Sequence, residues 1–147
     1  MLNDCSGKTA LITGAGTGIG RACAVALAEA GATVVVTDID AGTAKDTAAL
    51  ITKNGGKARA LGQDVTDEGV WENVIASIGA EEGGLNVLVN NAGIAIGVAV
   101  TEMSLADWQR QNAINLDGVF LGTKHAIPLM TQSGGGSIIN ISSIAGL

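Results

Sequence analysis

The sequence predicts an α/β fold, a doubly wound parallel sheet with helices on both faces. Short apolar runs alternate with segments of helical periodicity along the 147 residues, the pattern of strands joined by right-handed helical crossovers. Glycines gather in one turn, at 14–20, between the first apolar run and the first helical segment. Polar residues follow the later apolar runs. The carboxyl ends of parallel strands meet at one sheet edge, where ligands bind.

Composition indicates one globular domain and excludes several kinds of partner. Hydrophobic residues make up 47% and charged residues 15%, which suits a chain that forms a core. A net charge of -6 without a basic run argues against nucleic acid. Neither a membrane-spanning stretch nor a signal-peptide core is found in the sequence. Cys5 and Cys23 have no metal-binding or redox spacing. We therefore expect no metal site, no membrane partner and a cytoplasmic location.

The glycine-rich turn joins an expected strand at 8–13 to an expected helix at 18–30. Glycine allows positive φ and lets a ligand approach the backbone, and the free N–H groups at a helix start favour a phosphate. The spacing Gly14-x-x-x-Gly18-x-Gly20 predicts a nucleotide-binding turn, with an ordinary tight turn as the alternative. A P-loop is excluded because Leu2 stands where its first glycine belongs.

The remaining elements follow from apolar periodicity and from capping residues. We expect strands at 33–37, 57–61, 86–89 and 137–141. We expect helices at 41–54 after a capping Asp40, around 70–78, from Ser104 through a capping box with Asp107, and at 112–130.

Packing roles are expected for apolar residues at helical spacing. On the first helix the predicted buried face comprises Ile19, Cys23, Ala26, Leu27 and Ala30. The long helix is outlined by Ile114, Leu116, Phe120, Ile127 and Met130. Trp71, Trp108 and the three methionines are expected to pack, and His125, without a nucleophile or ligand cluster, is expected to be structural or exposed.

Polar residues at the predicted strand ends suggest how a nucleotide is held. Asp38 follows the second strand, where a carboxylate can accept both hydroxyls of an adenosine ribose, with a simple strand-end acid as the alternative. The same charge repels a 2′-phosphate by about 4 kcal/mol at 4 Å near a surface, which favours NAD over NADP. Asp64 and Val65 follow the third strand and suit an adenine amino group, with a plain loop acid as the alternative.

Three later parts of the sequence contribute further candidate site residues. Asn91-Ala92-Gly93 follows the fourth strand and offers an amide with a close backbone approach. Ser143 follows the fifth strand. Asn115 is unusual inside a helix, because asparagine competes for backbone hydrogen bonds. The alternative for Asn115 is a tolerated surface residue.

These motifs together resemble the classical short-chain dehydrogenase/reductase (SDR) family over essentially the whole chain. The resemblance is carried by Thr13-Gly14-x-x-x-Gly18-x-Gly20, Asp64-Val65, Asn90-Asn91-Ala92-Gly93, Asn115 and Ile139-Asn140-Ile141-Ser142-Ser143. It implies a Rossmann-type sheet in the strand order 3-2-1-4-5, lacking the family's later strands. It also implies a nicotinamide cofactor, hydride transfer to or from a small-molecule alcohol or ketone, and a homo-oligomeric intact enzyme.

The resemblance also assigns roles by position. Thr17 and Ile19 would line the pyrophosphate and nicotinamide side, Asp38 the ribose, and Asp64 with Val65 the adenine. Asn91 would lie at the inner ribose. The other expected cofactor residues are Gly14, Gly18, Gly20, Ala92 and Gly93. Ser143 would be the catalytic serine that hydrogen-bonds the substrate oxygen, and Asn115 would support a water-linked proton relay.

The chain departs from the family in its proton donor, a tyrosine set four residues before a lysine. The sequence contains no tyrosine, and its last lysine is Lys124. We therefore expect a single NAD-binding domain over 1–147, truncated after the fifth strand and inactive alone. Its exposed edge at 137–141 would favour self-association. The alternatives are a non-catalytic dinucleotide-binding module or an S-adenosylmethionine-dependent methyltransferase, against which Asn90-Asn91-Ala92-Gly93 counts.

Overall fold

The computed structural model describes residues 4–144 and contains one parallel sheet in the order β3-β2-β1-β4-β5. This order confirms the prediction. The strands are β1 (Thr9–Ile12), β2 (Thr33–Asp38), β3 (Lys57–Gly62), β4 (Val87–Asn90) and β5 (Ser137–Asn140). The helices are α1 (Gly18–Glu29), α2 (Ala41–Lys53), α3 (Glu68–Glu81), α4 (Leu105–Asn112) and α5 (Gly118–Gln132).

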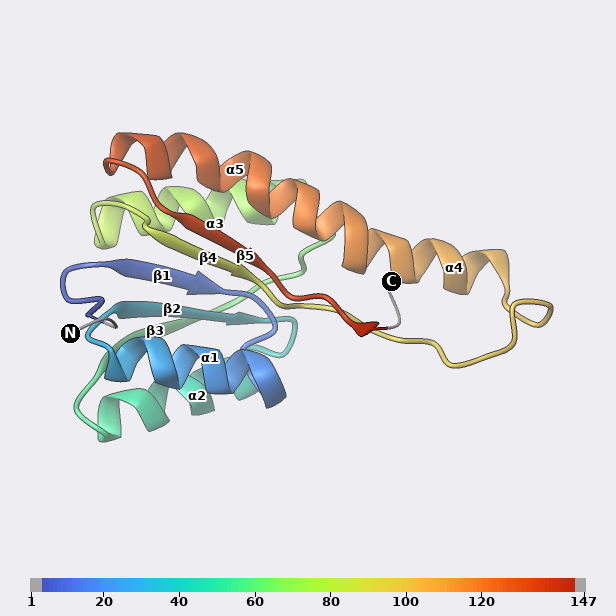
Figure 1. Cartoon of the computed structure of the whole chain (residues 1–147), viewed down its shortest axis with the longest axis horizontal. Coiled ribbons are helices and arrows are strands. Elements are labelled where there is room, and N and C mark those ends of the chain that lie inside the picture. Colours follow the sequence, from blue (N-terminus) through green and yellow to red (C-terminus); the bar gives the residue numbers. More distant parts are fainter. Residues whose placement is uncertain (1–3, 145–147) are drawn as a thin grey trace.

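The helices form two layers around the sheet (Figure 1): α1 and α2 cover one face, and α3 and α5 cover the other. A core lies on each side. One contains Ile12, Val34 and Val36 with the alanines of α1 and α2. The other contains Leu11, Trp71 and Leu88 with residues of α3 and α5. Because neighbouring residues of a strand face opposite layers, β1 contributes Leu11 to one core and Ile12 to the other.

The buried face of α1 differs from the predicted one. Gly20 and Ala24 are buried on this helix, together with Ala28, whereas Ile19 is 65% exposed and Ala26 is also exposed. The prediction followed the larger side chains, but the turn before α1 brings the helix against the sheet through its smallest residues. Cys23 lies partly buried against this core.

One long helical rod replaces the two helices predicted at 104–130. α4 continues through a π-helical segment, Ala113–Asp117, into α5, and Figure 1 shows the rod extending beyond the sheet. Its start is as predicted, since the Ser104 hydroxyl accepts from the Asp107 amide at 3.0 Å. The boundary expected between two helices near residue 112 is instead the point where α-helical winding changes to π-helical winding.

Several packing predictions fail on this rod because α4 extends beyond the sheet and α5 buries only one of its faces. Trp71 on α3 is fully buried, as expected, but Trp108 is 53% exposed. Leu116, Phe120 and Ile127 are also exposed, while Met130 is buried. Met1 lies outside the described residues. Among the helices at 4–144, none combines the length and apolar character needed to cross a membrane.

Candidate functional site

A groove of about 690 Å³ lies along the carboxyl edge of the sheet, within the range of small-molecule sites. All the predicted cofactor residues except Gly20 line it. Gly14, Thr17, Gly18 and Ile19 come from the turn after β1, and Asp38 comes from β2. The ends of β3 and β4 supply Asp64 with Val65, and Asn91 with Ala92 and Gly93. The structure thus brings four chain segments together at the edge where the topology places ligands.

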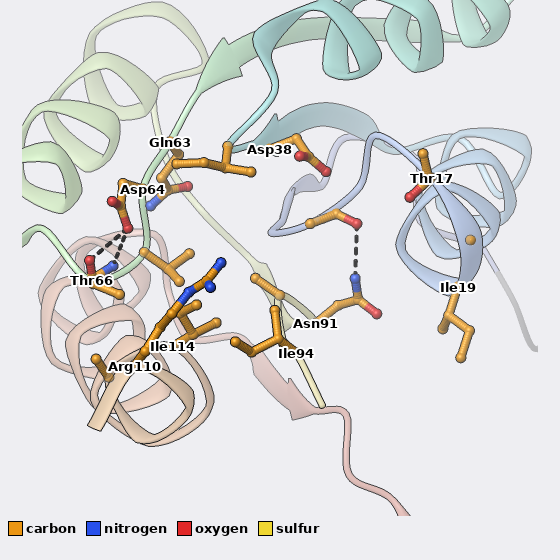
Figure 2. A pocket seen from close by; sticks show the side chains of 17 residues that line it. Thr17, Ile19, Asp38, Gln63, Asp64, Thr66, Asn91, Ile94, Arg110 and Ile114 are labelled. Atoms are coloured by element: carbon orange, nitrogen blue, oxygen red, sulfur yellow. Dashed lines mark hydrogen bonds between the residues drawn. The ribbon is translucent and has the colours of Figure 1, made fainter. Parts of the chain in front are cut away.

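The turn after β1 is joined to the end of β4 by side-chain hydrogen bonds. The Asn91 amide Nδ2 donates to the carbonyls of Thr13 at 2.9 Å and Gly14 at 3.0 Å. In return, the Thr13 hydroxyl accepts from the backbone N–H groups of Asn91 at 3.1 Å and Ala92 at 3.0 Å. Figure 2 shows Asn91 in this position. The floor of the groove is therefore held in place by the protein itself.

At two positions of the turn, the backbone conformation or the close packing permits only glycine. Gly14 adopts φ +60°, a region that favours glycine, and a Cβ there would lie 2.9 Å from the Ala92 Cα. A Cβ on Gly20 would collide with the Gly14 carbonyl oxygen and the Asn91 Nδ2. Gly20 thus belongs to the site as the residue that lets α1 begin against the turn, although it lies below the groove wall.

The start of α1 faces the groove with its backbone donors. Thr17 is the N-cap residue, and its side chain makes no capping hydrogen bond. Thr17, Gly18 and Ile19 are exposed, and Figure 2 shows the Thr17 and Ile19 side chains at one end of the groove. An uncapped helix start with exposed N–H groups and the positive end of the helix dipole suits an anionic group.

Asp38 is fixed beside this turn by two backbone donors. Its Oδ2 accepts from the Gly16 amide at 2.9 Å, and its Oδ1 accepts from the Asp40 amide at 3.0 Å. Each carboxylate oxygen keeps further acceptor capacity. On the other side of the turn, Arg21 donates to the Gly16 carbonyl and, through Nε, to the Thr47 hydroxyl at 2.9 Å. The prediction did not single out Gly16. A Cβ at position 16 would collide with the side chains of Thr43 and Asp38, so this position requires glycine.

The residues after β3 form a tight turn. Asp64 Oδ1 accepts from the Thr66 amide at 2.9 Å and the Thr66 hydroxyl at 2.7 Å. Val65 is buried, and its carbonyl accepts from the Trp71 indole Nε1 at 2.9 Å. Asp64 therefore keeps one carboxylate oxygen without a bond to Thr66, while Val65 supplies an apolar surface to the groove.

Asn115 clamps the segment after β4 to the helical rod. Its Oδ1 accepts from the Ile94 amide at 2.9 Å, and its Nδ2 donates to the Ile94 carbonyl at 2.8 Å. Gln111, one turn earlier, accepts from the Ile96 amide at 2.8 Å. This use explains an asparagine inside a helix, since its amide pairs with an extended segment as a neighbouring strand would.

Neither of the two predicted catalytic residues lines the groove, although Asn115 is bonded to the backbone of Ile94, which does. Asn115 lies in the π-helical segment and Ser143 lies beyond β5. Both are exposed, and neither belongs to the described residues that line the groove.

Sequence reasoning missed lining residues that come from the helical rod and from β3. Arg110, Ala113 and Ile114 reach the groove from α4 and the π-helical segment, and Gln63 reaches it from the end of β3. Gln63 is 3% exposed, and neither polar atom of its carboxamide has a hydrogen-bond partner. Apolar periodicity gives no signal for either polar residue, because their places depend on tertiary packing.

A separate surface group surrounds His125. Its Nε2 lies 2.9 Å from Glu68 Oε1, and the Lys124 ammonium lies 2.6 Å from the same oxygen. Hydrogen bonds from Lys124 and then His125 lower the pKa of Glu68. Glu72 joins Glu68 and His125 within 4.8 Å. His125 thus has acidic neighbours that sequence spacing did not reveal, brought together from α3 and α5, and Lys124 competes with any cation there.

The sheet order and the groove at its carboxyl edge define a Rossmann-type protein. The family model described as short chain dehydrogenase matches residues 8–147. The chain therefore belongs to the short-chain dehydrogenase/reductase family of oxidoreductases, which use NAD or NADP. This assignment decides against the methyltransferase alternative.

Two curated relatives and one solved structure illustrate the similarity. The chain is 45% identical over 147 residues to a 2,5-dichloro-2,5-cyclohexadiene-1,4-diol dehydrogenase of Sphingobium indicum, covering 100% of this chain and 59% of the relative. It is 41% identical over 140 residues to a cyclopentanol dehydrogenase of Comamonas testosteroni, covering 95% and 56%. A short-chain type dehydrogenase/reductase structure from Mycobacterium marinum matches with a TM-score of 0.95 and 41% identity, covering 99% and 59%. The chain thus spans less than two thirds of the length of these relatives.

Proposed function

We propose that this chain is the cofactor-binding portion of an NAD-dependent oxidoreductase that acts on a small-molecule alcohol or ketone. The observation that carries the choice of NAD is the carboxylate of Asp38, anchored 2.9 Å from the Gly16 amide at the groove wall. A carboxylate held there accepts ribose hydroxyls and repels a 2′-phosphate. Arg21 donates to the Gly16 carbonyl and the Thr47 hydroxyl, and among the described residues no ion pair joins it to Asp38.

The residues present fit a dinucleotide. The turn after β1 suits a phosphate because Gly18 places no side chain in the open space at the exposed start of α1. The buried Gln63 carboxamide, without a partner, adds a polar group that a ligand can satisfy. The nicotinamide supplies the hydride acceptor or donor when bound.

The chain's own residues would then have distinct tasks. The start of α1, with Thr17, holds the pyrophosphate. Asp38 holds the ribose, and Asp64 with Val65 holds the adenine. Asn91 positions the inner ribose. Ser143 hydrogen-bonds the substrate oxygen. Asn115 acts as a positioning residue for that chemistry, because its amide is committed to Ile94.

The substrate class is supported by the relatives, whose names give a cyclic diol and cyclopentanol as substrates. Catalysis by the whole protein is part of the proposal, because the chain spans 59% of the first relative. The 147 residues contain no tyrosine to act as proton donor. We therefore propose that these residues alone bind the cofactor without turnover.

The test is fluorescence titration of the 147-residue chain with NADH and NADPH. We expect NADH to bind at least about tenfold more tightly, since 1.4 kcal/mol, well below the unscreened repulsion, already gives that ratio. Asp38→Asn should weaken the binding of NADH and bring the affinities for NADH and NADPH closer together. The control Asp46→Asn removes one negative charge from an exposed position of α2. It should change neither the affinity for NADH nor the preference for NADH over NADPH. Equal binding of both cofactors by the wild type would refute the choice of NAD. No binding of either at millimolar concentration would refute cofactor binding itself.

A further inference from the structure

We propose that Arg110 forms the outer wall of the base end of the groove and holds the adenine ring by lying across its face. This inference rests on the proposed function, since it takes a dinucleotide as the ligand. It adds a binding residue that neither the glycine turn nor the strand ends contain.

The sheet order fixes which end of the groove takes the base. In the proposed function, the pyrophosphate would lie at the start of α1, after β1, and the ribose at Asp38, at the end of β2. β3 is the next strand outward from β2, whereas β4 lies on the opposite side of β1. A chain of groups that runs from β1 to β2 therefore places the base at the end of β3. Gln63, Asp64 and Val65 line the groove there.

Arg110 reaches this end from the helical rod. It lies in the last turn of α4 and lines the groove. Figure 2 shows its side chain extending from the helix on the side of Asp64 and Ile114, far from Thr17 and Ile19. Among the residues that line the described groove, Arg110 alone is cationic. The ion pairs found at residues 4–144 involve other side chains, so no described carboxylate holds its guanidinium.

The other walls at this end suit a flat ring with polar edges. Val65, Ala113 and Ile114 offer apolar surface on two sides. Gln63 contributes a carboxamide in a side chain that is 3% exposed, with both polar atoms unpartnered. A buried polar group without a partner is unusual in a folded protein. Because Gln63 also lines the groove, its carboxamide is a candidate partner for the polar edge of the base.

A guanidinium is better suited than an ammonium to close such a slot. It is planar, weakly hydrated and stacks on aromatic faces, whereas an ammonium acts as a compact point charge. Stacking on the base and attraction to the phosphates make different predictions. Stacking depends on the plane of the side chain and on the presence of the base. Attraction depends only on charge and on the phosphate.

The experiment compares Arg110→Met and Arg110→Lys by calorimetric titration with NADH, AMP, ribose 5-phosphate and reduced nicotinamide mononucleotide. Methionine keeps an unbranched apolar stem and removes the charged plane. We expect Arg110→Met to weaken NADH and AMP about three- to tenfold, with lysine recovering only part of the loss. Ribose 5-phosphate and the mononucleotide, which lack adenine, should bind the variants as they bind the wild type. Lys57→Met controls for net charge, because Lys57 starts β3 at the opposite sheet edge.

Four outcomes would overturn the inference. Unchanged AMP affinity in Arg110→Met would show that the side chain does not contact the base. Full recovery by lysine, or equal weakening of ribose 5-phosphate, would show a point-charge effect on phosphate. If the wild type binds neither NADH nor AMP, the proposed function fails, and this inference fails with it. A wild type that binds both while Arg110→Met is unaffected refutes the inference alone.

Discussion

Replacing Asn91 should loosen the groove before any ligand is added. In Asn91→Ala, the carbonyls of Thr13 and Gly14 lose donors at 2.9 and 3.0 Å. A hydrogen bond in a folded protein contributes about 0.5–1.5 kcal/mol net. Two such bonds therefore predict a loss of about 2 kcal/mol in the free energy of unfolding. For a chain of this length the loss corresponds to a melting temperature about 4–8 °C lower.

Chemical denaturation and thermal scans of the variant measure both quantities. Asn112→Ala is the matched control, because its Nδ2 donates at 2.9 Å to the Trp108 carbonyl on an exposed helix face. We expect the control to lie within about 0.5 kcal/mol of the wild type. A loss below about 0.5 kcal/mol in Asn91→Ala would refute the reasoning, since the turn would then hold its shape without the amide.

A second substitution at the same position tests the direction of the bonds. Asn91→Asp places an ionised carboxylate, which can only accept, against two carbonyl acceptors. These surroundings disfavour the charged form and raise the pKa of the new carboxyl in the folded state. The variant should therefore be less stable than Asn91→Ala at neutral pH and should recover as the pH falls through that pKa. A parallel pH dependence of the two variants would show that the amide does not act as the donor.

Three further predictions follow from contacts described above. Gly20→Ala should destabilise the fold by about 1–3 kcal/mol in denaturant titration, because overpacking displaces the neighbours of the new methyl group. The control Gly97→Ala has open space around it and should be nearly neutral. Equal effects of the two substitutions would show that the close approach at Gly20 can relax. Gln63→Met should raise the melting temperature of the ligand-free chain by a few degrees, since it removes two buried unpaired atoms; a lower melting temperature would mean that the amide is satisfied in solution. Because Lys124 is the main cause of the lowered pKa of Glu68, the contribution of Glu68 is present above its ordinary pKa and lost as the pH falls through the folded value. The stability difference from Glu68→Gln should shrink in acid, and a difference independent of pH would refute it.

The parts of the site that sequence reasoning could locate are those set by local chemistry. Glycines at 14, 18 and 20 mark the turn, and polar residues mark the ends of β2, β3 and β4, where the topology gathers them. The glycine cluster at 14–20 includes Gly16, but sequence reasoning assigned it no site role, because its constraint comes from Thr43 and Asp38, which are distant in sequence.

The parts that escaped prediction depend on how elements are placed against one another. On α1 the apolar pattern favoured Ile19, but contact with the sheet selected the small residues Gly20 and Ala24. Arg110 and Gln63 occur in segments whose polar residues have no periodic signature. Their position at the groove follows from the path of the helical rod and from the pairing of β3.

The π-helical segment at 113–117 sets an angle as well as a path. One residue of an α-helix corresponds to a rotation of about 100°, and a π-helical turn accommodates an extra residue. If the same residues were wound as a regular α-helix, α4 would be turned by about that angle relative to the α5 residues packed on the sheet. Arg110 would then point away from the groove, with its own surroundings in α4 unchanged. The winding of the segment between Arg110 and Gly118 thus matters as much as the identity of Arg110, because a change of winding can remove the proposed binding residue from the groove without altering it.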